Sequence, residues 1–352
     1  MQIVSTASAF PKHYYSQDEL LAALQQYWGD RIDNPTVLRR LHRHVGVAGR
    51  FLAVPKEEYL TMRTWGEANG HWIRTATELG ERAVSDALAG AGLKAGELGA
   101  FFFTSVTGIS SPSIDALLVN KMGLCRHIRR VPIFGLGCVA GAAGISQAAD
   151  YVKANPGQIA VLLSVELCSL TLQREDLSMA NLISAGLFGD GAAAVIVAGA
   201  DCVLPGVAGP TILATRSVFY PNTEEMMGWA ISEKGFRIVL SRDVPNLVRK
   251  NLGHDVDDFL SSRGLTRADI GSWVLHTGGP KILEATAEAL ALSNGQLDAS
   301  WDCLRRTGNL SSASVLVVLD EVMKNRRPER GTLGMLAAMG PGFCSEFVLL
   351  QW

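Results

Sequence analysis

Three polar residues stand where an apolar segment gives way to a glycine-rich turn or a helix: Cys138, His276 and Asn309. Cys138 follows the apolar segment 131–134 and begins a helix of small residues, whose dipole favours a thiolate. His276 ends a second apolar segment and opens onto a Gly-Gly-Pro loop, a position suited to acting on a ligand. A thiol, an imidazole and an amide are the groups that nucleophilic acyl transfer requires.

Each of these residues also has a structural interpretation. A free cysteine usually packs as a small hydrophobe, and Asn309 could serve only as the N-cap of a helix that begins near Leu310. The strand–glycine–cysteine–helix setting of Cys138 favours the catalytic interpretation. The place of Asn309 in an internal repeat favours the catalytic interpretation for this residue as well.

The glycines around Cys138 do not indicate a nucleotide cofactor. GLGCVAG (135–141) has the spacing G-x-G-x-x-x-G, one residue longer than the dinucleotide fingerprint, and no acidic residue follows about 20 positions on. We therefore exclude NAD. The six cysteines form no C-x-x-C pair and the histidines do not cluster with them, so we expect neither a metal nor another cofactor.

The elements that position these residues occur twice in the chain. Residues 91–108 resemble residues 263–279, and residues 135–156 correspond in pattern to residues 306–325. Each copy predicts a buried strand (100–103 and 272–275), a glycine turn with a small-residue helix, and a second buried strand (159–165 and 332–338). Equivalent turns of such a repeat meet across a pseudo-twofold axis.

This repeat predicts an α/β fold with two halves, residues 1–200 carrying the cysteine and residues 201–352 carrying the histidine and the asparagine. Alternating strands and helices favour mostly parallel sheets covered on both faces. Glycines and prolines near residue 200 mark the boundary.

Composition narrows the class of protein. The chain has 352 residues, is 48% hydrophobic and carries a formal net charge of −2. It has no long basic block, which argues against nucleic-acid binding. It also has no apolar run of membrane-spanning length and no signal-peptide pattern at residue 1, so we expect a cytoplasmic protein without a membrane span.

At these residues the chain resembles the type III polyketide synthases, the chalcone-synthase-like branch of the thiolase superfamily. The likeness runs nearly end to end and is carried by GLGCVAGA (135–142), LFGDGAAA (187–194), HTGGPKILE (276–284), GNLSSAS (308–314) and AMGPGFCSE (338–346). It implies a thiolase-like five-layer αβαβα fold, a homodimer, and an acyltransferase that uses acyl-CoA and malonyl-CoA without a cofactor.

The resemblance also implies roles for individual residues. Cys138 becomes the acyl-carrying nucleophile, and His276 and Asn309 complete the triad. The substrate pocket would include Phe188 as a gatekeeper, Ile238 at the second gatekeeper position, Val106, Leu170, Ser311, and the turn Gly340, Pro341 and Gly342. Basic residues that could meet the CoA phosphates are Arg39, Arg43 and Arg50, with a solvated helix face as the alternative.

Within this family the chain is most similar to bacterial alkylpyrone and alkylresorcinol synthases. The segments that carry this likeness include 104–115, 165–183 and 226–245. Val106 and Leu170 align with pocket threonines of plant chalcone synthases, and two apolar side chains suit a fatty acyl starter. Two alternatives stay open: a ketoacyl-ACP synthase III-like condensing enzyme and a non-catalytic partner subunit with the same fold.

Overall fold

Two sets of strands with the same order form the centre of the molecule. The computed structural model describes residues 1–32, 35–204, 206 and 209–352, and in that part the large sheet has nine strands in the order β11-β12-β13-β8-β1-β7-β6-β4-β5. The bounds of these strands are β1 Gln2–Ala9, β4 Ala100–Thr104, β5 Arg129–Ile133, β6 Ile159–Leu167, β7 Asp190–Ala198, β8 Thr211–Phe219, β11 Ile270–Leu275, β12 Leu333–Gly340 and β13 Cys344–Gln351.

The order of strands confirms the internal repeat. The series β4-β6-β7-β1 of the first half matches the series β11-β12-β13-β8 of the second, and the two series meet where β1 pairs with β8 at Gln2 and Thr211. Each predicted strand of the repeat is present, with bounds that differ from the prediction by one or two residues.

The sheet is mixed, so the expectation of mostly parallel strands is wrong. β4 pairs in parallel with β5 and β6, and β11 pairs in parallel with β12. The pairs β6–β7, β1–β7, β12–β13 and β8–β13 are antiparallel. The short turn after Gly340 is the reason for one of them, because it reverses the chain directly from β12 into β13.

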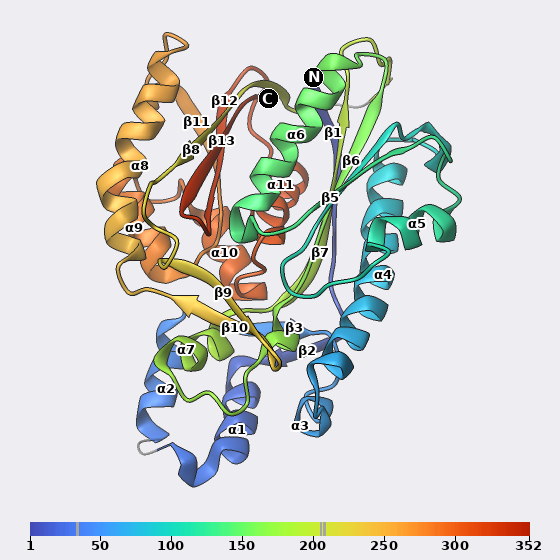
Figure 1. The fold of residues 1–352 in the computed structure, drawn as a ribbon. Coiled ribbons are helices and arrows are strands. Elements are labelled where there is room, and N and C mark those ends of the chain that lie inside the picture. Colours follow the sequence, from blue (N-terminus) through green and yellow to red (C-terminus); the bar gives the residue numbers. More distant parts are fainter. Residues whose placement is uncertain (33–34, 205, 207–208) are drawn as a thin grey trace.

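The two halves of the large sheet form two layers, and helices lie between these layers and on their outer faces, which gives the five layers αβαβα (Figure 1). The helices α6 and α11 lie between the two halves of the sheet, α4 and α5 cover the strands of the first half, and α8 and α9 cover those of the second. Their bounds are α4 Trp65–Gly90, α5 Ile114–Met122, α6 Ala140–Ala154, α8 Val244–Ser261, α9 Pro280–Leu290 and α11 Ala313–Asn325.

Small residues let α6 fit between the two sheets. A Cβ atom on Gly144 would lie 2.5 Å from the side chain of Leu162, and one on Gly141 would lie 2.2 Å from the carbonyl oxygen of Ser312. Both distances are shorter than a non-bonded contact allows, so the narrow space around this helix requires glycine at these two positions.

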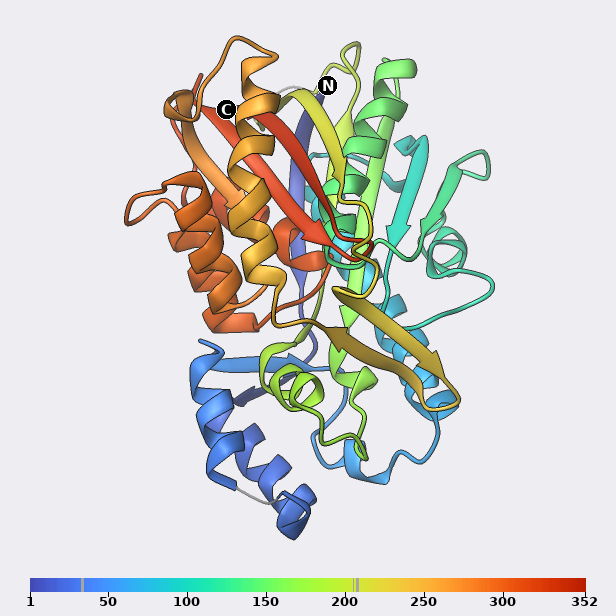
Figure 2. The ribbon, with the colours of Figure 1, turned by 60° about the vertical axis from the view of Figure 1, so that its left-hand side comes forward.

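A smaller region lies below the five layers in Figure 2 and is built mainly from residues 13–32, 35–61, 168–188 and 227–240. Helix α10 lies next to this region but belongs to the second half of the chain. The bounds here are α1 Gln17–Trp28, α2 Pro35–His44, α3 Glu58–Thr61, α7 Met179–Leu187, α10 Asp298–Thr307, β2 His13–Ser16, β3 Gly49–Leu52, β9 Met227–Ser232 and β10 Gly235–Leu240. In the described residues no helix is long and apolar enough to cross a membrane.

Candidate active site

Cys138 lies in a single 3₁₀ turn, Gly137–Val139, between β5 and the first residue of α6. Gly137 adopts a φ of +52°, and a Cβ atom there would lie 2.5 Å from the ring of Pro341. A Cβ atom on Gly340 would lie 2.6 Å from the backbone nitrogen of Val139. The β12–β13 turn therefore packs directly on the turn that carries the thiol, as the expected pocket role of residues 340–342 requires.

Asn309 lies in the turn between α10 and α11 and is 2% exposed. Its Oδ1 accepts hydrogen bonds from the backbone N–H of Ser311 (2.8 Å) and the hydroxyl of Ser314 (3.3 Å). These contacts fix the side-chain amide so that its Nδ2 donor is free for a ligand.

Ser311 brings the asparagine turn to the cysteine. Its hydroxyl lies 3.6 Å from the Cys138 sulfur, and its backbone has a φ of +49°, a conformation that non-glycine residues rarely adopt. The structure thus joins Cys138, Ser311 and Asn309 in one place, although 173 residues separate Cys138 from Ser311.

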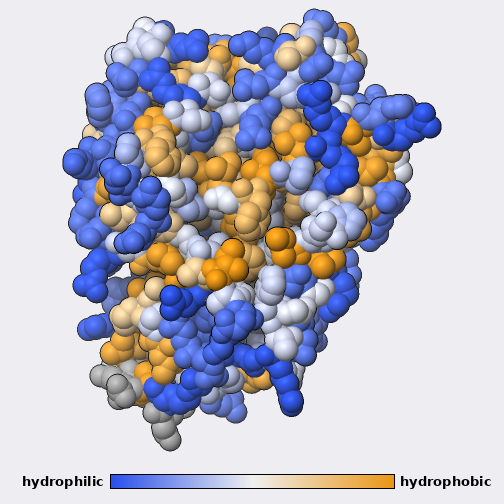
Figure 3. Space-filling model, viewed as in Figure 1, coloured by the Kyte–Doolittle hydropathy of each residue, from blue (hydrophilic) through white to orange (hydrophobic). Residues whose placement is uncertain are grey.

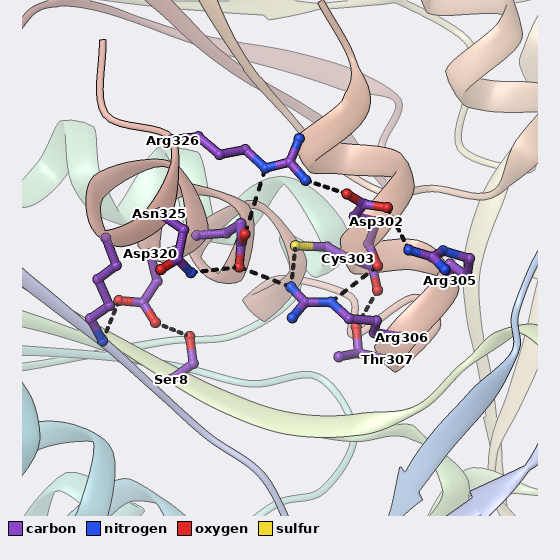
Figure 4. A network of polar contacts seen from close by, with 11 residues as sticks. Ser8, Asp302, Cys303, Arg305, Arg306, Thr307, Asp320, Asn325 and Arg326 are labelled. Carbon is purple, nitrogen blue, oxygen red and sulfur yellow. Dashed lines mark hydrogen bonds and ion pairs between the residues drawn. The ribbon is translucent and has the colours of Figure 1, made fainter. Parts of the chain in front are cut away.

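A network of ion pairs holds the helices on either side of this turn (Figure 4). Arg306 of α10 pairs with Glu321 of α11 at 2.9 Å, and Arg326 pairs with Asp302 and with Glu321. Asp320, the residue before Glu321 on α11, accepts a hydrogen bond from Ser8 of β1 at 2.8 Å. Because several charges share these contacts, the network fixes α10 against α11 more firmly than an isolated surface pair would.

His276 follows β11 directly and is 6% exposed. Its backbone N–H donates to the carbonyl of Ala337 on β12 (3.1 Å), which keeps it in the sheet that leads to Gly340. Its Nδ1 is buried and has no hydrogen-bond partner among the described residues, so no carboxylate there orients or charges the ring.

Burial favours the neutral forms of both reactive groups. Loss of solvation raises the pKa of the Cys138 thiol to about 12 and lowers the pKa of His276 to about 4. Burial thus works against the thiolate that the helix dipole favours. A neutral imidazole is the form of His276 that is able to accept a proton.

Glu166 is a buried carboxylate that the sequence analysis did not assign to the site. Its oxygens accept hydrogen bonds from the backbone of Val106 (3.1 Å), the hydroxyl of Thr107 (2.9 Å) and both the backbone and the hydroxyl of Ser312. Burial raises its pKa. The visible signal was a single acidic residue within the apolar segment 159–167, and its contacts tie the loop after β4 to the loop of Asn309.

An apolar pocket lies beside Phe188, whose backbone forms a β-bridge with Asn309. Trp229 and Ile238, which pair across β9 and β10, form one wall of the pocket. The other residues that line it include Leu20, Leu24 and Tyr27 of α1, Asn181, Ser184 and Ala185 of α7, Leu52, Tyr59, Leu60, Cys168, Thr171 and Leu172. The structure therefore places both expected gatekeeper positions on one cavity.

Two other expected pocket residues do not line this cavity. Leu170 is 8% exposed and packs into the hydrophobic core on the α4 side of the sheet. Val106 is also buried, with its backbone N–H bonded to Glu166. The two apolar side chains that stand in place of the threonines therefore belong to the core and to the loop of Glu166, and they do not shape this pocket.

The three basic residues considered for CoA binding lie in different environments. Arg39 and Arg43 are exposed on α2. Arg50 is buried, donates to the carbonyl of Phe188 at 2.7 Å and lies close to Asp190, so its position suits a structural role better than contact with a phosphate at the surface. Burial lowers the pKa of Arg50 to about 10.

The fold defines a thiolase-like condensing enzyme, and in it a cysteine lies beside the asparagine turn. The family model for the N-terminal domain of chalcone and stilbene synthases matches residues 51–202, and the model for their C-terminal domain matches residues 211–352. The chain belongs to this family and is a type III polyketide synthase, an acyltransferase that condenses CoA thioesters.

Relatives and solved structures agree with this assignment. The 1,3,6,8-tetrahydroxynaphthalene synthase of Streptomyces peucetius subsp. caesius is 48% identical over 99% of this chain and 93% of its own length. A putative chalcone synthase of Bacillus subtilis is 33% identical over 99% of this chain and 98% of its own. The crystal structure of the 1,3,6,8-tetrahydroxynaphthalene synthase from Streptomyces coelicolor, a bacterial type III polyketide synthase, superposes with a TM-score of 0.94 at 30% identity, covering 100% of this chain and 99% of that one.

These matches set aside both alternatives raised from the sequence. Both halves of the chain match chalcone and stilbene synthases, which separates it from a ketoacyl-ACP synthase III. The relatives that match nearly the whole chain are synthases of this family, so the chain is an enzyme rather than a non-catalytic partner subunit.

Proposed function

We propose that this synthase loads a fatty acyl starter on Cys138, extends it with malonyl-CoA and cyclises the product to an alkylpyrone or an alkylresorcinol. The observation that carries the proposal is the apolar pocket beside Phe188. Two of its polar groups, the hydroxyls of Tyr59 and Ser169, are bonded to each other, and Ser169 also donates to Asp190. Most of the pocket surface that remains open to a ligand is therefore hydrocarbon.

In the proposed mechanism, His276 accepts the Cys138 proton and the thiolate attacks the acyl-CoA carbonyl, releasing CoA and leaving an acyl thioester. Malonyl-CoA then loses CO₂, and the electron pair of the broken bond forms an enolate at the thioester oxygen. Nδ2 of Asn309 donates to this oxygen, and a hydrogen-bond donor of this kind contributes about 2.7–4 kcal/mol. The enolate carbon attacks the acyl carbonyl, the bond from that carbonyl to the Cys138 sulfur breaks, and Cys138 leaves as the thiolate. The chain, now two carbons longer, is then held as a CoA thioester. The reaction requires no metal or other cofactor.

The pocket predicts a preference for long starters. Each buried methylene contributes about 0.8 kcal/mol, so four more carbons contribute roughly 3 kcal/mol. Ordering the tail offsets about half of this, which leaves roughly a tenfold preference. A phenolic starter would bury its hydroxyl against hydrocarbon, and an unpaired hydroxyl costs about 1–3 kcal/mol.

The test compares kcat/KM for lauroyl-CoA, hexanoyl-CoA and coumaroyl-CoA, each with malonyl-CoA, together with product masses. Lauroyl-CoA has six more carbons than hexanoyl-CoA and by the same reasoning should exceed it by roughly 50-fold, and it should also exceed coumaroyl-CoA. If coumaroyl-CoA equals or exceeds lauroyl-CoA, the starter assignment is wrong while the assignment to the family stands.

The relatives favour a second candidate, in which malonyl-CoA alone supplies every carbon. Both named tetrahydroxynaphthalene synthases cover nearly the whole chain. The same assay without any starter tests this candidate, because a tetrahydroxynaphthalene product at a rate above that of the lauroyl reaction would replace the fatty acyl proposal.

We also propose that the enzyme is a homodimer, as the resemblance implies. Large apolar side chains are exposed on the described surface, among them Phe134 (53%) and Phe219 (61%). Figure 3 shows apolar residues gathered across the middle of the face on which α6 and β9 lie. Such a surface is typical of a protein–protein interface.

A further inference from the structure

Two helices that line the apolar pocket are joined by a small set of hydrogen bonds on their far side. Helix α1 contributes Leu20, Leu24 and Tyr27 to the lining, and α7 contributes Asn181, Ser184 and Ala185. The distance between α1 and α7 therefore sets the width of the cavity in which we place the starter.

Gln17, the first residue of α1, bonds this helix to the end of α7. Its side-chain nitrogen donates to the carbonyl of Gly186 at 2.8 Å and to the carbonyl of His42 at 3.2 Å. Gln17 is 8% exposed, so water competes little for these bonds.

His42 of α2 fills the space between the two helices. It is 1% exposed, and its Nε2 lies 3.2 Å from the carbonyl of Leu182 on α7. A carbonyl can only accept, so Nε2 carries the proton and donates. The ring also packs on Gly186, because a Cβ atom added there would lie 2.8 Å from its Cδ2 atom.

The contacts made by Gln17 and His42 end two residues before Phe188. The carbonyl of Leu187 accepts from the backbone N–H of Asn309 (2.9 Å), and the N–H of Gly189 donates to the carbonyl of Asn309 (3.0 Å). The end of α7 thus lies next to the gatekeeper, and hydrogen bonds on both sides of Phe188 hold this short segment to the backbone of Asn309.

We propose that Gln17 and His42 determine the starter preference by fixing the separation of α1 and α7. They are positioning residues, because neither lines the apolar pocket and both act through α7. The inference rests on the proposed function, since it assumes that the pocket takes the acyl tail. Small changes at Gly186 or Gln17 then alter chain-length preference without removing any group of the triad.

Gly186→Ala is the direct test, because the new methyl group must displace α7 from His42. We expect the ratio of kcat/KM for palmitoyl-CoA to that for octanoyl-CoA to rise about fourfold, the change that two newly accommodated methylenes give when ordering of the tail offsets half of their contribution. Malonyl-CoA decarboxylation without a starter should stay within about twofold of the wild type, since no triad side chain is replaced and the hydrogen bonds between residues 187–189 and Asn309 hold the asparagine turn in place when α7 shifts. Gly70→Ala in α4, where the nearest atom is 3.6 Å away, is the matched control and should change neither quantity.

Two further variants separate a specific effect from general damage. The double variant His42→Ala, Gly186→Ala makes room for the new methyl group, so its palmitoyl-to-octanoyl ratio should return toward the wild-type value. If the two substitutions instead damaged the fold in general, the double variant would depart further from the wild type than either single variant. Gln17→Leu removes both hydrogen bonds without adding bulk and should shift the ratio in the same direction as Gly186→Ala. An unchanged ratio in Gln17→Leu and in a folded Gly186→Ala protein would overturn the proposal.

A binding measurement distinguishes this proposal from the proposed function. Parinaric acid, a fluorescent C18 polyene fatty acid, reports occupancy of an apolar cavity whether or not fatty acyl-CoA is a starter. Its Kd should fall in Gly186→Ala by about the factor by which the kinetic ratio rises. A shifted Kd with no turnover of any fatty acyl-CoA would refute the proposed function and leave the role of Gln17 and His42 intact. An unshifted Kd would refute that role.

Discussion

Replacing Asn309 by aspartate separates the two tasks of this side chain. The carboxylate keeps an oxygen where Oδ1 accepts from the backbone of Ser311 at 2.8 Å, so the turn retains its support. Nδ2, the donor available to the enolate, is replaced by an acceptor. Asn309→Ala removes both functions and leaves the N–H of Ser311 buried without its partner, which costs about 1–3 kcal/mol of folding free energy.

The loss of one donor to a developing oxyanion is worth about 2.7–4 kcal/mol, or about 10²–10³ in rate. Decarboxylation of malonyl-CoA by Asn309→Asp should fall at least this far at pH 8, because a carboxylate also repels the enolate. Burial favours a protonated carboxyl, which can donate. The activity of the aspartate variant relative to the wild type should therefore rise as the pH falls from 8 to 6.

The assay follows CO₂ release from carboxyl-labelled malonyl-CoA without a starter, alongside thermal unfolding of each variant. We expect Asn309→Asp to unfold close to the wild type and Asn309→Ala to unfold at a lower temperature. Decarboxylation by Asn309→Asp above a tenth of the wild-type rate at pH 8 would refute the role of Nδ2, because the side chain would then act only as support for the turn.

Four other outcomes are expected. Peptide mapping after incubation with an acyl-CoA should place the adduct on Cys138, and an adduct on the pocket residue Cys168 instead would remove Cys138 from the mechanism. Gly340→Ala should reduce acylation of Cys138 by about tenfold or more, because its Cβ atom would lie 2.6 Å from the backbone nitrogen of Val139; unchanged loading would contradict the packing described here. The pKa of buried His42 is lowered from 6.5 to about 4, so the unfolded chain binds its proton first and stability falls below pH 6.5. Between pH 7.5 and pH 5 wild-type unfolding free energy should therefore fall by about 2 kcal/mol more than that of His42→Gln, as urea titrations would show, and an equal fall in both would disprove this. Sedimentation at micromolar concentration should show a dimer, and a stable species of 37.7 kDa would contradict it.

The sequence was sufficient to predict the repeat and the proximity of the cysteine and asparagine turns. Two copies of one supersecondary unit place equivalent turns together, and the contact between Cys138 and Ser311 confirms this for the two chain segments. The strand–turn–helix setting of Cys138 was equally visible, because glycine spacing and a change of hydrophobic period mark it directly.

Three features could not be read from the chain. The antiparallel pairings depend on which strands meet in space, and hydrophobic runs look alike in both kinds of buried sheet. The burial of Arg50 depends on the carbonyl of Phe188 and on Asp190, partners about 140 residues away. The resting charge of His276 follows from desolvation by the complete fold, whereas the sequence shows only its neighbours along the chain.

The position of β1 has a consequence for synthesis of the protein on the ribosome. This strand, residues 2–9, is made before every other strand of the large sheet, yet its neighbours in the sheet are β7 at residues 190–198 and β8, which begins at residue 211. At about 5–20 residues per second the ribosome needs roughly 10–40 s to supply them. During that interval an apolar strand has neither sheet partner. Nascent chains are then exposed to aggregation or to capture by chaperones, and slower translation of the first half would lengthen that exposure.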